Sequence, residues 1–300
     1  MMIATDEYEL LTTAVGLIDR SERAKFTVGG GEAAGFLQGQ VSNDVEALAP
    51  GTGCYAAILN HKGKFRADLR LLRTDEGFWL DADSISHAVV QHMLRTYSLG
   101  REVHWEDATQ SHALLSLIGP GAREWIEGEE HVSRAGDEGL WVVTDLGADL
   151  ILPAGSAEAV RERLGVDEVS EAAAECLRIE SGRPRLGWDM DGDTIPQEAG
   201  VNERAVSFTK GCYVGQETVA RLHYKGRPNR HLRGLRLEAP AERGAEILLG
   251  ERVVGRLGSS CVSPTLGPIA LAIVRREVEP GHEVLVEGAP AQVVELPFTS

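Results

Sequence analysis

The chain has 300 residues, 43% of them hydrophobic and 25% charged, a composition that is ordinary for a globular protein of about two domains. Acidic residues outnumber basic ones by 46 to 30, so the formal net charge is −16, which argues against a protein that coats nucleic acid or an anionic membrane over its whole surface. Thirty-four glycines are too many for a helical bundle and indicate many turns and substantial β structure.

Hydrophobic spacing predicts the elements of the amino-terminal part. Residues 32–41 place apolar side chains at helical spacing, and residues 54–59 are typical of a buried strand. The clearest alternation runs over residues 64–71, with apolar side chains on one face and charged ones on the other, and a turn and return strand follow it. Further helices are predicted over residues 84–97 and 171–180.

The carboxy-terminal part has a different pattern. From about His231, short apolar runs are separated by turns that contain glycine or proline. This pattern predicts a small all-β domain, of which a barrel is the expected form. We therefore divide the chain into residues 1–230 and 231–300.

The ends, apolar runs and cysteines bear on location. The first twenty residues lack a basic region followed by an apolar core, and the longest apolar run, Ile269 to Val274, is far too short to cross a bilayer. We expect a cytoplasmic protein with no membrane association. No CxxC pair occurs among the four cysteines, which are Cys54, Cys176, Cys212 and Cys261. With no HxH or HxxxH spacing either, we expect no stable metal site.

The segment from Lys210 to Glu217 (KGCYVGQE) is the most distinctive in the chain. Two glycines flank Cys212, so the backbone is expected to turn tightly and present the thiol on a loop. Lys210 would favour the thiolate, which is the form that attacks an electrophile or binds a metal. The alternative is a half-buried cysteine in a turn, because free cysteines usually behave as small hydrophobic residues.

Two cationic strips suggest an anionic partner. Between residues 210 and 233 there are six basic residues and one acid, and this strip includes Arg221, Lys225 and Arg227. On the alternating strand, Arg66 and Arg70 flank Asp68 on one face and are expected to hold it ionised. A polyglutamate tail, a phosphate or RNA would suit such strips. The alternatives are a solvated linker and a salt-bridged outer sheet face.

Residues 210–217 resemble the KGCYxGQE signature of the YgfZ family of folate-binding proteins, whose eukaryotic relatives are mitochondrial iron–sulfur assembly factors. The signature residues around the thiol are Gly211, Tyr213, Gly215, Gln216 and Glu217. Other segments resemble the related glycine-cleavage aminomethyltransferase, or T-protein. Residues 35–45 are similar to its FLQ…NDV segment, and residues 178–182 to its RLEAG segment.

The resemblance implies an α+β fold of three domains in a ring: two mixed α/β (ferredoxin-like) subdomains and a small carboxy-terminal β-barrel. It further implies bound tetrahydrofolate, or a derivative of it. Glu180 would hold the pterin N–H groups, as carboxylates do well, and Asp68 would lie near the reduced ring nitrogen, with Asn60 close by. The cationic residues around Asp68 and after Lys210 could meet the glutamate tail of the folate.

The sequence departs from the T-protein pattern in two places. The T-protein has two acids before the leucine that corresponds to Leu69, and here the first is Ala67 while Asp68 is kept. Its DFIG-like loop is replaced by the loop that carries Cys212. Losing one acid and gaining a cysteine argues against ordinary aminomethyl transfer.

Our main interpretation is therefore an accessory factor for iron–sulfur cluster assembly or repair rather than a conventional enzyme. It would bind tetrahydrofolate, use Cys212 as its functional thiol, and support enzymes that include the one that methylthiolates tRNA. A lone thiolate predicts a cluster shared transiently with a carrier or client protein. The alternative is a folate-dependent aminomethyl or other one-carbon transferase that uses Asp68. Direct tRNA binding through residues 221–233 is the least favoured, given the net charge. We interpret the other three cysteines as structural.

Overall fold

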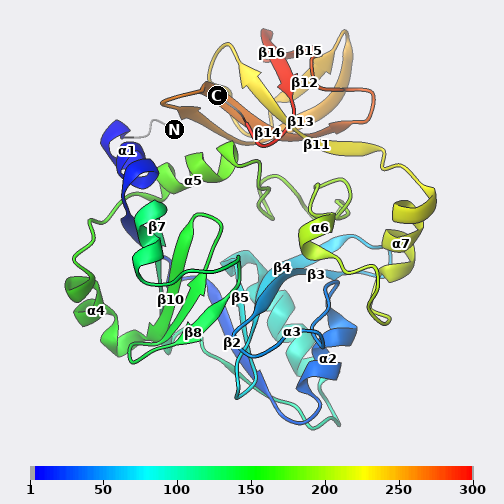
Figure 1. Ribbon diagram of the computed structural model, residues 1–300. Coiled ribbons are helices and arrows are strands. Elements are labelled where there is room, and N and C mark those ends of the chain that lie inside the picture. The colour runs from blue at the N-terminus through cyan, green and yellow to red at the C-terminus, as the bar shows by residue number, and fades with distance from the viewer. Residues whose placement is uncertain (1–3, 299–300) are drawn as a thin grey trace. The chain divides into compact units, whose positions relative to one another are not determined.

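The computed structural model describes residues 4–298, and the chain forms two compact units (Figure 1). The larger unit consists of residues 10–169 and 202–218. The other consists, within the described residues, of residues 4–9, 170–201 and 219–298. The domain boundary that we placed after residue 230 stays a prediction.

The larger unit contains a first five-stranded antiparallel sheet with helices packed on one face. Its strand order is β3 (Gly53–Leu59), β4 (Phe65–Arg73), β5 (Phe78–Ala82), β2 (Ala24–Gly29) and β6 (His104–Asp107). The helices are α2 (Ala33–Gln40) and α3 (His87–Tyr97), the latter preceded by a 3-10 helix at Ser84–Ser86. The predicted strands at 54–59 and 64–71 and helices at 32–41 and 84–97 are thus confirmed.

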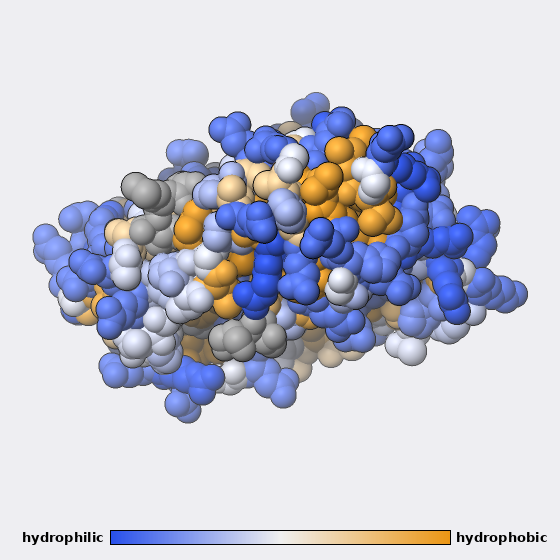
Figure 2. Space-filling model, turned by 90° about the horizontal axis from the view of Figure 1, so that it is seen from above, coloured by the Kyte–Doolittle hydropathy of each residue, from blue (hydrophilic) through white to orange (hydrophobic). Residues whose placement is uncertain are grey.

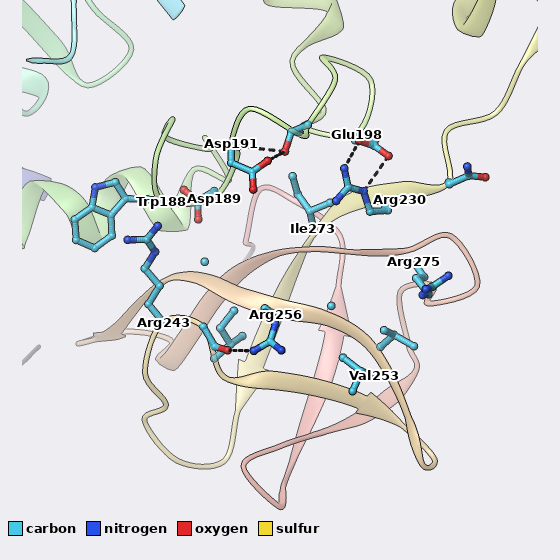
Figure 3. A pocket seen from close by; sticks show the side chains of 17 residues that line it. Trp188, Asp189, Asp191, Glu198, Arg230, Arg243, Val253, Arg256, Ile273 and Arg275 are labelled. Atoms are coloured by element: carbon cyan, nitrogen blue, oxygen red, sulfur yellow. Dashed lines mark hydrogen bonds and ion pairs between the residues drawn. The ribbon is translucent and has the colours of Figure 1, made fainter. Parts of the chain in front are cut away.

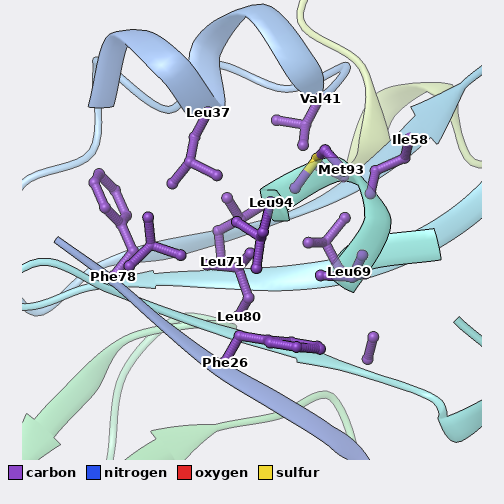
Figure 4. Packing of buried hydrophobic residues seen from close by; sticks show 14 of the residues in the cluster. Phe26, Leu37, Val41, Ile58, Leu69, Leu71, Phe78, Leu80, Met93 and Leu94 are labelled. Atoms are coloured by element: carbon purple, nitrogen blue, oxygen red, sulfur yellow. The ribbon is translucent and has the colours of Figure 1, made fainter. Parts of the chain in front are cut away.

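The core between this sheet and its helices accounts for the alternating pattern of apolar residues along β4. Leu37 from α2 and Leu94 from α3 point toward Leu69 and Leu71 of β4 (Figure 4), and all four side chains are buried. Each such side chain removed from water contributes about 1.5–3 kcal/mol. The apolar face of β4 therefore fixes which side of the sheet the helices cover.

A second five-stranded antiparallel sheet completes the larger unit. Its order is β1 (Gly16–Asp19), β7 (His112–Ile118), β10 (Gly147–Pro153), β9 (Leu140–Val143) and β8 (Ser133–Ala135). The accompanying helices are α4 (Ala157–Leu164) and two 3-10 helices at Pro120–Glu124 and Ala154–Ser156, whereas the short α6 (Asn202–Ala205) contacts β3 of the first sheet. Leu72 from the first sheet packs with Leu114, Val142 and Ile151 from the second, so the two sheets share a core.

The other unit is built around a closed six-stranded barrel, as predicted. The strands, in spatial order, are β11 (Arg230–Leu237), β14 (Gly267–Arg275), β13 (Arg252–Ser263), β12 (Glu246–Leu249), β15 (Glu283–Val286) and β16 (Ala289–Val294). Every neighbouring pair is antiparallel, and β16 pairs with β11 to close the ring. Small and β-branched residues such as Ala270, Val274 and Val293 fill its interior.

Three helices remain. Helix α5 (Glu171–Glu180), which matches the predicted range, contacts β13 and β14 of the barrel. Helices α1 (Thr5–Thr13) and α7 (Gln216–Lys225) each contain residues of both units. On the face seen in Figure 2, hydrophilic side chains cover most of the surface and apolar ones gather toward its middle. Within residues 4–298, no helix combines the length and apolar character needed to cross a membrane.

Candidate functional site

The signature loop is tied at its start by Lys210. The lysine Nζ donates three hydrogen bonds of 2.7 Å, to the backbone carbonyls of Gln38, Val41 and Asn43 at and beyond the end of α2. The side chain is 8% exposed, and burial lowers the pKa of Lys210 to about 8. All three ammonium donors are thus used by carbonyls. We expected Lys210 to favour the thiolate of Cys212. Its ammonium group instead anchors the loop through these backbone carbonyls.

The far side of the loop is fixed by Gly215. Its φ is +86°, and a Cβ atom there would lie 2.5 Å from the carbonyl oxygen of Asn60 and 3.2 Å from Cα of Gly63. The loop therefore packs closely on the turn between β3 and β4, which only glycine permits. The side chain of Tyr213, between the two anchors, is buried, with its ring 5.1 Å from the Lys210 ammonium.

Asn60 shapes the turn on which the loop rests. Its Oδ1 accepts hydrogen bonds from the backbone N–H groups of Lys62 (2.8 Å) and Lys64 (3.2 Å). Its side-chain amide nitrogen has no partner within residues 4–298. The structure thus brings together two segments that the sequence analysis had singled out separately, the signature loop and the turn that contains Asn60.

Cys212 is exposed between these two anchors. Its neighbours Gly211 and Val214 are exposed as well, and a Cβ atom at Gly211 would meet nothing within 4 Å. Gln216 and Glu217 begin helix α7, half-buried and exposed respectively. The loop therefore presents a thiol to solvent from a backbone that is held on both sides.

Asp68 lies on β4 with a hydroxyl partner that the sequence analysis did not identify. Tyr55 on the neighbouring strand β3 donates a 2.7 Å hydrogen bond to its Oδ2. Asp68 is half-buried, and this burial raises the pKa of its carboxyl, while the hydrogen bond from Tyr55 acts in the opposite direction. The side chains of both residues lie on the same face of adjacent strands. Their pairing follows from their proximity in the sheet and cannot be read from the sequence.

The expectation that Arg66 and Arg70 together hold Asp68 ionised needs correction. Arg66 is exposed, but Arg70 is buried and pairs instead with Asp81 at 2.8 Å and Asp149 at 2.7 Å. Asp149 lies on β10 of the second sheet, which covers this part of the polar face of β4. Arg70 is therefore a structural ion-pair residue and is not available to a folate tail.

In the other unit, the carboxylate of Glu180 ends helix α5 and is held by Tyr8. The Tyr8 hydroxyl lies 3.1 Å and 3.0 Å from the two Glu180 oxygens and 3.1 Å from Oγ1 of Thr265. The thiol of Cys176 donates to Oε1 at 3.5 Å. A carboxylate has about four acceptor positions, so lone pairs remain on this one for further N–H donors. These residues fit the role that the resemblance gives Glu180.

The remaining predicted cations lie on and after α7. Arg221, Lys225 and Arg227 are all exposed. They belong to the same unit as Glu180, whereas Cys212, Asn60 and Asp68 belong to the larger unit. An exposed cationic segment suits an anionic group, as the sequence analysis expected.

The smaller unit also has a cavity of 660 Å³ that no sequence pattern predicted (Figure 3). Arg243 stacks over the ring of Trp188 at 4.9 Å, and Arg230 pairs with Glu198 at 2.7 Å. None of Asn60, Asp68, Glu180 or Cys212 lines it. In the part of the chain that the structure describes, no group of three or more His, Cys, Asp or Glu residues is placed to hold a metal ion.

Comparison with known proteins identifies the family. The GCVT N-terminal domain family matches residues 2–135, and the glycine cleavage T-protein C-terminal barrel domain family matches residues 230–299. The aminomethyltransferase of Thermus thermophilus is 30% identical, over 98% of this chain and 89% of the relative. That of Rubrobacter xylanophilus is 29% identical, over 97% of this chain and 85% of the relative.

A solved structure agrees. The crystal structure of the glycine cleavage system aminomethyltransferase T from Bartonella henselae matches with a TM-score of 0.89 at 26% identity, covering 98% of this chain and 89% of that one. The predicted T-protein-like fold, with mixed α/β parts and a carboxy-terminal barrel, is confirmed. From its domains, its relatives and its fold, the chain belongs to the aminomethyltransferase family.

Proposed function

We propose that this protein binds a tetrahydrofolate, with Glu180 as the acceptor for the pterin N–H groups. The observation that carries the proposal is the geometry of the Glu180 carboxylate, which Tyr8 holds while leaving lone pairs on both oxygens. Asp68 and the side-chain amide nitrogen of Asn60 are the candidate polar ligands in the larger unit. Membership of the aminomethyltransferase family supports a folate ligand. A cytoplasmic location, expected from the sequence, suits this role.

Transfer of an aminomethyl or other one-carbon group to folate is the activity that the names of the relatives favour. Asp68 would orient the amine or the folate nitrogen. Its raised pKa moves the carboxyl toward the neutral range in which proton transfer is most effective, and Tyr55 would keep it oriented. The tetrahydrofolate would supply the nitrogen that accepts the one-carbon group.

A second candidate rests on the exposed thiol. Cys212 is presented by an anchored loop that resembles the YgfZ signature, and Ala67 stands where the T-protein has its first acid. In this function, Cys212 would bind a cluster in transit, and a carrier or client protein would supply the other ligands. The folate would then be a bound partner, and the enzymes served would include the one that methylthiolates tRNA.

Folate binding is tested by calorimetric titration with tetrahydrofolate under anaerobic conditions. We expect saturable binding that Glu180→Gln weakens roughly tenfold, because a hydrogen bond to a charged acceptor contributes about 1.5 kcal/mol or more. Glu251→Gln, at an exposed turn position, is the matched control and should bind normally. Failure of the unaltered chain to bind tetrahydrofolate would remove the proposal.

The two activities are separated by one complementation experiment. A bacterium that lacks its own YgfZ-type protein would carry the unaltered chain, Cys212→Ser or Asp68→Asn, and the methylthiolated fraction of its tRNA would be measured by mass spectrometry. Loss with Cys212→Ser alone supports the accessory role. Normal tRNA with Cys212→Ser, together with one-carbon turnover by the purified chain that Asp68→Asn abolishes, supports the transferase.

A further inference from the structure

Two buried thiols lie against each other behind Glu180. Cys176 on α5 and Cys261 on β13 place their Sγ atoms 3.3 Å apart, and both are free thiols. They belong to one hydrophobic cluster, in which Ile179 and Ile269 also join α5 to the barrel. A disulfide of about 2.05 Å needs a further approach of roughly 1.2 Å, which small side-chain rotations on two packed elements can supply.

The pair is connected to Glu180 by hydrogen bonds. Cys261 donates its S–H to Cys176, which in turn donates to Oε1 of Glu180 at 3.5 Å. The Tyr8 hydroxyl lies 3.1 Å and 3.0 Å from the two carboxylate oxygens. The hydrogen bond from Cys261, together with burial, raises the pKa of Cys176, so this thiol stays protonated at neutral pH. The resting state is therefore a dithiol whose two successive hydrogen bonds end on the carboxylate of Glu180.

We propose that Cys176 and Cys261 form a reversible redox site, in which an intrachain disulfide between α5 and β13 withdraws the thiol hydrogen bond from Glu180. The oxidant is a small-molecule disulfide. Cys261, 5% exposed against 0% for Cys176, reacts first by virtue of access. As its thiol gives up its proton, its sulfur bonds to one sulfur of the small molecule, whose S–S bond breaks and releases the first small thiolate. This thiolate takes up the proton.

The second step closes the protein disulfide. The Cys176 thiol passes its proton to Glu180, to which it is hydrogen-bonded, and its sulfur attacks Sγ of Cys261, forms the Sγ–Sγ bond and breaks the mixed disulfide, which releases the second small thiolate. The two protons from the cysteine thiols leave on the two small thiols. Two protein thiols are thereby oxidised while one small-molecule disulfide is reduced, and excess small thiol reverses the reaction.

The disulfide also has a consequence for the ligand, and this part rests on the proposed folate function. Oxidised Cys176 has no proton to donate, so Glu180 keeps its contacts with Tyr8 but loses the Cys176 thiol as a donor to Oε1. A carboxylate that is less firmly fixed binds its partner less well, by about fivefold for one lost hydrogen bond. The affinity of the chain for folate thus depends on whether Cys176 and Cys261 are reduced or oxidised.

The test uses a full-length chain in which Cys54→Ala and Cys212→Ser leave only the pair. This variant is incubated at graded ratios of oxidised to reduced glutathione, quenched with acid, unfolded and alkylated, and its free thiols are counted by mass spectrometry. We expect two thiols to be lost together, with peptide mapping joining Cys176 to Cys261. Two free thiols at every ratio, or glutathione on single cysteines without a crosslink, would overturn the proposal.

Matched variants test which cysteines the crosslink requires. In the otherwise unaltered chain, Cys261→Ala should abolish the crosslink, whereas Cys54→Ala should keep it. Tetrahydrofolate titration of the two-cysteine chain should then give about a fivefold higher Kd when oxidised and recovery after reduction. An unchanged Kd would overturn the coupling to Glu180. Absence of folate binding in both states would instead count against the proposed function, and the crosslink would still decide the redox site.

Discussion

The phenol of Tyr55 donates a 2.7 Å hydrogen bond to Oδ2 of Asp68 from the neighbouring strand. Burial raises the pKa of Asp68, and this bond partly offsets the rise because it stabilises the ionised carboxylate. Tyr55→Phe should therefore raise the pKa of Asp68 further. Carbon-13 NMR titration of the aspartate carboxyls measures it directly, with Asp68→Asn assigning the signal. A lower pKa in Tyr55→Phe would contradict this account.

Lys210 should be a stability residue. Lys210→Met leaves the carbonyls of Gln38, Val41 and Asn43 without their donors, and we expect a loss of about 3 kcal/mol in the free energy of unfolding. Urea denaturation measures the loss. Lys225→Met, at an exposed position on α7, should change stability by less than about 0.5 kcal/mol. Equal stability of the two variants would show that the three bonds contribute nothing.

The two glycines that flank Cys212 should differ in their tolerance of substitution. Gly215→Ala places a methyl group 2.5 Å from a backbone oxygen at a φ of +86°, so it should destabilise the chain by about 2 kcal/mol or more and displace the loop. Gly211→Ala meets open space and serves as the control. Thermal unfolding measures the loss of stability, and the alkylation rate of Cys212 reports the displacement of the loop. Similar behaviour of both variants would refute the close packing on Asn60.

Acid should weaken the larger unit through Asp81. Burial raises the pKa of this 2%-exposed carboxyl, but Arg23 and Arg70 more than offset the rise and hold it at about 2. The unfolded chain takes up this proton near pH 4 and the folded chain does not, so stability is present above that pH and is lost as pH falls toward 2.

The pKa shift corresponds to about 2 kcal/mol. Urea denaturation between pH 5 and pH 2.5 should therefore show a shallower loss of stability in Asp81→Asn than in the unaltered chain. Asp137→Asn, at an exposed position, should keep the original slope. A slope that Asp81→Asn leaves unchanged would mean that other carboxyls dominate the acid response.

The elements were predictable where burial on one face leaves a periodic trace. The apolar side chains of β4 alternate, and those of α2 and α5 recur at helical spacing, so both strand and helices followed from the sequence. The barrel followed from its short apolar runs and turns. These signals are local, and each reports the surroundings of its own segment.

The site was harder to predict because its contacts are distant in sequence. Tyr8 reaches Glu180 across 172 positions, and Lys210 binds carbonyls, which every residue has and which therefore leave no trace in the sequence. Arg70 looked exposed because alternation tells only that one face of β4 is apolar. A second sheet covers part of the polar face. Its Asp149, which pairs with Arg70, is 79 positions away in the sequence.

The pairing of β16 with β11 has a consequence for recognition. Because the ring is complete, each described strand of the barrel has a hydrogen-bonded neighbour on both sides, and the sheet has no edge strand. A partner cannot extend this sheet with a strand of its own. Whatever docks on the barrel must be recognised through side chains and loops, so its specificity should be alterable by surface substitutions that leave the backbone scaffold intact.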